Sequence, residues 1–178
     1  MFGWARTKKL EPHAGEVDLS GAHDRLAGGE GHVAGAIDTE DRAAVMDSLI
    51  LCKFLRGVFE DPFPEWANLL NLVTGWDVGA DELATTARRI VLAKRLFNLR
   101  EGWTRDEDWL PDRFLSESLE LVSGRTATLT PNKLNAMIDS YYRSRGLEPN
   151  GVPTPGTVRE LDLDGLTGHT MQIAAEVG

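Results

Sequence analysis

The sequence predicts an all-α fold, and three observations support that prediction. Apolar residues recur at spacings of three and four in several stretches, as they do on the buried face of a helix. Thr-Pro pairs and single glycines stand where helices would begin and end. No stretch of useful length alternates polar and apolar residues as a strand does, and no segment is repeated.

An almost wholly apolar stretch over residues 43–55 is the expected centre of the fold. We predict a helix from about Arg42 to Phe59, buried on most sides because apolar residues surround it rather than lining one stripe. Pro62 and Pro64 would end it, since proline cannot continue a helix. Its start is expected at a cluster of small polar and acidic residues that can cap free N–H groups: Asp38, Thr39, Glu40 and Asp41.

Five further helices follow from the same kinds of signal. The longest is expected from about Ala80 to Arg100, where Leu83, Ala87 and Ile90 begin an apolar face. Thr130 is expected to cap a helix that begins at Pro131 and closes at Gly146. The remaining helices are expected at residues 64–73, 112–121 and 155–161.

The two ends of the chain carry weaker patterns. Residues 1–38 hold seven glycines without periodicity and are predicted to be loop-like, ahead of a helical domain at residues 39–163 and a tail at 164–178. This N-terminal segment also holds His13, His23 and His32. Their spacing matches no metal site that we can name, so their role stays open.

Charge and composition exclude several classes of partner. The net charge of −9 argues against nucleic acid and against an anionic membrane surface, which both attract basic patches. No apolar run reaches the roughly 18 residues of a membrane span, and no secretory signal is apparent at the N-terminus. A single cysteine cannot form an internal disulfide, which is consistent with the cytoplasmic location that we expect.

The central stretch carries one acid, Asp47, and the only cysteine, Cys52. Structural roles are the ordinary interpretation: a cysteine in an apolar helix is usually small, buried and inert, and an acid near a helix start is usually a cap. For Asp47 that interpretation is strained, because a full turn of apolar residues precedes it. A carboxylate in such surroundings is costly without a partner.

The stretch Asp47-Ser48-Leu49-Ile50-Leu51-Cys52-Lys53-Phe54 resembles the D-x-x-G-L-C-K-F motif near the C-terminal end of aldehyde ferredoxin oxidoreductases. Further blocks of resemblance follow in the same order over residues 42–161. They are Thr74-Gly75-Trp76-Asp77-Val78, residues 96–105, Leu110-Pro111-Asp112-Arg113, residues 137–146 and Gly151-Val152-Pro153-Thr154.

The resemblance implies specific roles for three residues. In that family, tungsten is held by two pterins beside an iron–sulfur cluster. The acid of the motif hydrogen-bonds a pterin, the leucine approaches it, and the cysteine is the last of four cluster ligands. Here these positions are Asp47, Leu51 and Cys52. The motif's glycine is Ile50, and a branched side chain there would crowd the pterin or alter the helix packing.

The family's other three cluster cysteines are absent, and one thiolate cannot hold a [4Fe–4S] cluster. The chain thus resembles only the C-terminal helical domain of the enzyme, and we assign it no catalytic residue. As a split subunit it would need a cysteine-rich partner chain, a shared [4Fe–4S] cluster, a tungsten or molybdenum bis-pterin, and ferredoxin as electron acceptor. The alternative is a non-catalytic helical remnant that acts as an interaction module. In isolation we expect no cofactor and no activity.

Overall fold

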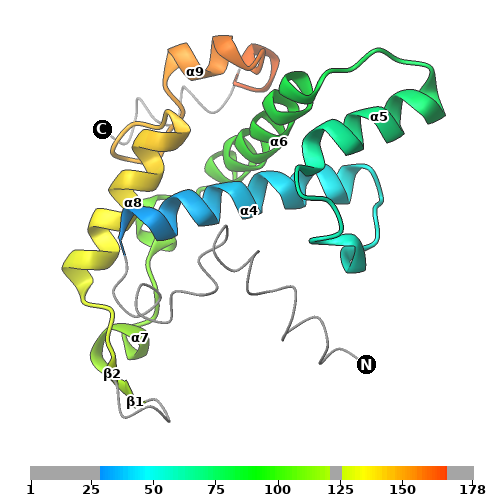
Figure 1. The fold of residues 1–178 in the computed structure, drawn as a ribbon. Helices are drawn as coiled ribbons and strands as arrows, with labels where there is room; N and C mark the ends of the chain where they lie inside the picture. The colour runs from blue at the N-terminus through cyan, green and yellow to red at the C-terminus, as the bar shows by residue number, and fades with distance from the viewer. Residues whose placement is uncertain (1–28, 121–125, 168–178) are drawn as a thin grey trace. The chain divides into compact units, whose positions relative to one another are not determined.

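A computed structural model describes residues 29–120 and 126–167 of the chain. These residues are mostly helical, which confirms the predicted all-α class (Figure 1). Two strands of two residues each form one antiparallel pair, in which Leu119 faces Ala127. The elements in order are α4 (Glu30–Ser48), η1 (Lys53–Leu55), α5 (Pro62–Thr74), α6 (Ala80–Arg100), η2 (Arg105–Asp108), α7 (Arg113–Ser116), β1 (Leu119–Glu120), β2 (Thr126–Ala127), α8 (Pro131–Arg145), α9 (Pro155–Glu160) and η3 (Asp164–Leu166).

The described residues belong to two compact units. The first consists of residues up to 37 together with 103–151, and the second consists of residues 38–102 together with those from 152 onward. Helix α4 therefore begins in the first unit and ends in the second. The predicted boundary at residue 38 falls inside this helix. Because residues 1–28 and 168–178 lie outside the described residues, the predicted division into three segments stays a prediction.

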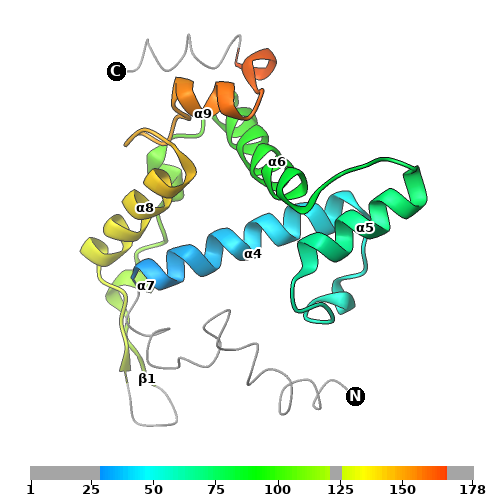
Figure 2. The ribbon, with the colours of Figure 1, turned by 45° about the horizontal axis from the view of Figure 1, so that its top comes forward.

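The second unit holds the apolar core that the central stretch was expected to form. Val45 and Met46 of α4 are almost fully buried and pack with residues of α5 and α6: Trp66, Ala67, Leu83 and Ala87. Helices α5 and α6 are packed against each other, as Figure 2 shows. Removing this much apolar surface from water is the main stabilising contribution in such a core.

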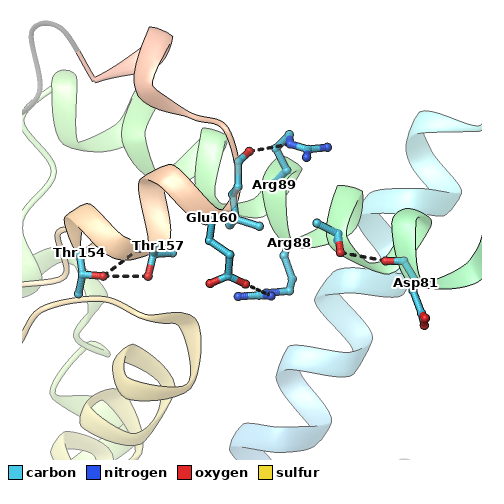
Figure 3. A network of polar contacts seen from close by, with 8 residues as sticks. Asp81, Arg88, Arg89, Thr154, Thr157 and Glu160 are labelled. Carbon is cyan, nitrogen blue, oxygen red and sulfur yellow. Dashed lines mark hydrogen bonds and ion pairs between the residues drawn. The ribbon is translucent and has the colours of Figure 1, made fainter.

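Polar contacts fix α9 to the middle of α6 within the second unit, and Figure 3 shows them at close range. Arg88 Nη1 donates to Glu160 Oε1 at 2.8 Å, and Arg89 Nε donates to the Leu161 carbonyl oxygen at 2.7 Å. The Thr154 side chain accepts from the Thr157 amide and so caps α9 at the Thr-Pro signal. Arg88 and Arg89 therefore hold the last helix in place.

The first unit is organised around Arg105. Its guanidinium donates to the Pro149 carbonyl, to Asn135 Oδ1 at 2.8 Å and to Asp139 Oδ1 at 2.6 Å, and it stacks over the Tyr142 ring. These contacts join η2 to α8 and to the loop that follows α8. Tyr142 in turn donates its hydroxyl hydrogen to Asp108.

Several predicted helix boundaries agree with the structure. Helix α6 runs from Ala80 to Arg100, and α8 begins at Pro131 under the Thr130 cap and ends at a left-handed Gly146. Helix α7 is shorter than predicted, four residues at Arg113–Ser116, since Phe114 on it is 61% exposed and buries little apolar surface. No helix of the described residues is long and apolar enough to cross a membrane.

The prediction for the central helix is wrong at both ends. Helix α4 begins at Glu30 rather than near Arg42, so residues 30–38, which were predicted to be loop-like, are helical. It ends at Ser48, eleven residues before Phe59. The acidic residues at 38–41 therefore lie inside the helix, where Asp38 accepts a hydrogen bond from Arg42 Nε at 2.9 Å.

Candidate functional site

The candidate site is the end of α4 and the loop that follows it, residues 49–61, which we call the Cys52 loop. The helix ends in a Schellman motif. The Leu51 amide donates to the Met46 carbonyl at 2.9 Å, and the Ile50 amide donates to the Asp47 carbonyl at 3.2 Å. This pattern requires a left-handed residue just past the helix, and Ile50 adopts that conformation with φ of 57°. Chain direction therefore changes just before the cysteine.

Ile50 is an unusual residue for this conformation. A left-handed backbone places Cβ against the following carbonyl oxygen, which costs about 1–2 kcal/mol for an ordinary L residue and makes a β-branched residue an outlier. The same hydrogen-bond pattern closes α8 at Gly146 and α9 at Asp162, where glycine and aspartate tolerate it better. The glycine of the family motif thus corresponds to a position whose backbone favours glycine in this fold.

Cys52 lies in the loop, not in a helix. It is exposed, and its carbonyl accepts the Leu55 amide at 2.9 Å to start the single turn of η1. The expectation of a buried, inert thiol is therefore wrong, because the Schellman motif turns the chain out before residue 52. An exposed thiol is accessible to a metal or to a partner.

Asp47 is exposed in the last turn of α4, which corrects the expectation of a carboxylate in apolar surroundings. Its carboxylate forms an ion pair with Lys53 Nζ at 2.5 Å. The hydrogen bond from Lys53 lowers the pKa of Asp47 below its usual value, slight burial opposes that shift, and the nearby charges of Lys53, Lys94 and Arg56 add to it. The ammonium also offsets the repulsion between an acid and the negative end of the helix dipole.

Leu51 is less exposed than Asp47 and Cys52, the other two candidate residues. Its side chain is half-buried and packs against the core cluster that contains Val45 and Met46. The loop is thus held to the second unit at Leu51 and again at Phe59, while the residues between them are exposed. Sequence reasoning found Asp47, Leu51 and Cys52 but missed Lys53, although its position in the motif and its opposite charge could have indicated the ion pair.

The remaining candidate residues do not add a second site. Among the described ranges, no group of three or more His, Cys, Asp or Glu side chains is placed to hold a metal. His32 lies in α4, whereas His13 and His23 fall outside the described residues. In the block around residue 100, Arg100 pairs with Glu101 at 3.1 Å, and the Trp103 indole donates to Asp108 at 2.9 Å.

The fold and the site together define a helical domain that presents one thiol and one ionised carboxylate but no complete metal site among its described residues. Comparison with known proteins then gives the family. Residues 5–163 match the family described as "Aldehyde ferredoxin oxidoreductase, domains 2 & 3", and the chain belongs to this family.

Named relatives give the same result over a shorter range. The chain is 33% identical over 127 residues to the tungsten-containing aldehyde ferredoxin oxidoreductase of Pyrococcus horikoshii and 34% identical to that of Pyrococcus furiosus. The corresponding protein of Thermococcus kodakarensis is 32% identical over 126 residues. In each comparison the match covers 70% of this chain but 20% of the relative. The chain therefore spans about a fifth of the length of these relatives.

Proposed function

We propose that this chain is the C-terminal part, or a split subunit, of a tungstopterin, iron–sulfur enzyme that oxidises aldehydes to carboxylic acids and passes the electrons to ferredoxin. The observation that carries the proposal is the exposure of Cys52 on a loop with a defined conformation. A cysteine kept for packing would be buried, whereas one that completes a cluster held mainly by another chain has to be accessible.

The residues present fit part of the cofactor site. Cys52 would supply one of the four thiolates that a [4Fe–4S] cluster takes, and a cysteine-rich partner chain would supply the other three. Asp47, whose pKa is lowered by the hydrogen bond from Lys53, would accept hydrogen bonds from pterin amino groups. Lys53 would hold that carboxylate in place at 2.5 Å. Leu51 would offer the pterin only the part of its side chain that the core leaves accessible.

When bound, the metal–pterin group, with tungsten or molybdenum, supplies the two-electron oxidation of aldehyde and water to acid. The residues of this chain would place the Cys52 thiol and keep water away from the site. Leu51 and Phe59 anchor the loop on the core, so the thiol of Cys52 is presented at a fixed place. The exposed apolar residues of the loop would exclude water once a partner covers them.

The alternative is a non-catalytic helical module, and one observation favours it. Ile50 stands at a left-handed position where the family motif has glycine, so this chain departs from the motif between its two cofactor-binding positions. A remnant, however, has no requirement for an accessible thiol beside a paired carboxylate.

The test is an anaerobic pull-down of the tagged chain from its native cells, with iron, tungsten and molybdenum quantified in the eluate. We expect iron and one of the other two metals, together with a cysteine-rich partner. The Cys52→Ala variant should recover the same partner with at least half of the iron lost and the cluster's electron paramagnetic resonance signal absent. A metal-free wild-type chain would favour the remnant, and unchanged iron in Cys52→Ala would exclude Cys52 as a ligand.

A further inference from the structure

Positive charge gathers around the end of α4, although the net charge of the chain is −9. Lys53 Nζ lies 2.5 Å from Asp47 Oδ1. Arg56 Nε donates to the Lys53 carbonyl at 3.4 Å, which keeps the guanidinium beside the start of η1. The three charges that act most on the Asp47 carboxylate are all positive, and they come from two segments of the second unit: Lys53 and Arg56 of the Cys52 loop and Lys94 of α6.

The packing of α4 with α6 explains why Lys94 takes part. Val45 and Met46 of α4 belong to the same core cluster as Ala87 of α6. Lys94 follows Ala87 after about two turns, so the two residues share one face of that helix. The Lys94 side chain is exposed, and its ammonium is close enough to Asp47 to help lower the pKa of that carboxyl group.

The charges in this group do not balance. Asp47 is paired with Lys53. Neither Arg56 nor Lys94 forms an ion pair with a carboxylate of the part of the chain that the structure describes. Three cations therefore face one carboxylate, which leaves two positive charges unmatched. The two acids of the loop itself, residues 60 and 61, come only at its far end.

We propose that Lys53, Arg56 and Lys94 form a binding site for a phosphate group beside Asp47. A phosphate monoester carries about 1.5–2 negative charges near pH 7, which matches two unmatched positive charges better than a carboxylate does. The arginine fork and the lysine ammonium are the side chains that most often bind phosphate oxygens. Phosphate binding here goes beyond the proposed function and is independent of it, because the site consists only of residues of this chain.

The test is a titration of the nitrogen-15-labelled full chain with sodium phosphate at pH 7, followed by amide chemical shifts. An ionic strength held at about 0.1 M screens charges that lie far from the site. We expect saturable shifts at Lys53 and Arg56, with a Kd in the millimolar range because the site is exposed. Acetate should bind about fivefold more weakly, since it carries less charge. Equal binding of acetate, or shifts that grow linearly as they do with chloride, would overturn the proposal.

Substitutions within the site should change the affinity in opposite directions. Arg56→Gln and Lys94→Met each remove an unmatched charge and should weaken phosphate binding about threefold to tenfold. Asp47→Asn removes the competing carboxylate and frees the Lys53 ammonium, so binding should tighten about threefold. All of these side chains are exposed, so the fold should tolerate the changes. Unchanged affinity in the first two variants, or weaker binding in Asp47→Asn, would refute the site.

Two control variants make the same kinds of charge change elsewhere. Arg143→Gln removes an exposed positive charge from α8 in the first unit, and Glu60→Gln removes a negative charge from the far end of the Cys52 loop. Both should bind phosphate like the wild type.

Phenyl phosphate identifies the source of the ligand. Binding about fivefold tighter than that of inorganic phosphate would support a phosphate carried on a larger molecule, because further contacts then add to those of the phosphate oxygens. Equal binding would support free phosphate as the ligand. The absence of binding by both compounds would overturn the proposal, and it would leave the proposed function untouched.

Discussion

The connection between α5 and α6 depends on one side chain, and its removal gives a quantitative test of the fold. Asn71, in the last turn of α5, donates from Nδ2 to the Val78 carbonyl at 2.9 Å and accepts the Val78 amide at 2.9 Å through Oδ1. The residues between them form the left-handed end of α5 at Gly75 and the exposed Trp76. We expect Asn71→Ala to release this connection.

The magnitude follows from the two hydrogen bonds. Each contributes roughly 0.5–1.5 kcal/mol net, and both Val78 groups are half-buried, so the loss is about 2 kcal/mol. Alanine returns roughly 0.5 kcal/mol because it favours the helix more than asparagine does. The free energy of unfolding should therefore fall by about 1.5 kcal/mol.

The assay is urea unfolding at pH 7 followed by circular dichroism, with Asn68→Ala as the matched control. Asn68 is exposed one turn earlier on the same helix, so its substitution measures the propensity gain alone. The difference between the free energies of unfolding of the two variants gives the contribution of the two hydrogen bonds between Asn71 and Val78. Hydrogen exchange should also show that the Val78 amide loses protection in Asn71→Ala. A difference below about 0.5 kcal/mol with unchanged exchange would refute the reasoning.

Two further predictions concern ion pairs. The lowered pKa of Asp47 means that the Asp47–Lys53 pair stabilises the fold above the ordinary aspartate pKa of about 4 and is lost as the pH falls through the lowered value. In Lys53→Met, carbon-13 NMR should show the pKa of Asp47 returning toward its usual value, and an unmoved pKa would contradict the assignment to Lys53. Arg105→Lys should lower the free energy of unfolding by about 1–3 kcal/mol, since lysine cannot contact Pro149, Asn135 and Asp139 together. Arg113→Ala, which removes an exposed pair with Glu117, should change it by less than about 0.5 kcal/mol, and equal losses in both variants would refute the central role of Arg105.

Helices with explicit start and stop residues were predictable from the sequence. The Thr130-Pro131 pair and Gly146 bound α8, and Thr154-Pro155 starts α9, because each signal corresponds to a local hydrogen bond or a backbone angle. The bounds predicted from the long apolar pattern of α6, Ala80 and Arg100, also agree with the structure.

The end of α4 was not predictable, and the reason is a single residue. The helix stops at a left-handed position that sequence rules recognise by glycine, but the residue there is Ile50. The apolar run across it therefore indicated a continuous helix, and burial was predicted for Asp47 and Cys52. Resemblance to the family selected the candidate site residues as positions in a motif, and their role stays a prediction. The exposure of Asp47 and Cys52 and the pairing of Asp47 with Lys53 depend on tertiary structure.

The exposed position of Cys52 also gives this chain a natural reporter. Because it is the only cysteine, a maleimide dye or spin label would attach at one known place without any substitution. A thiol bound to iron would not alkylate, so the fraction of molecules that resist the reagent counts the assembled enzyme directly. The same residue that is proposed to complete the cluster can thus be used to follow its assembly over time.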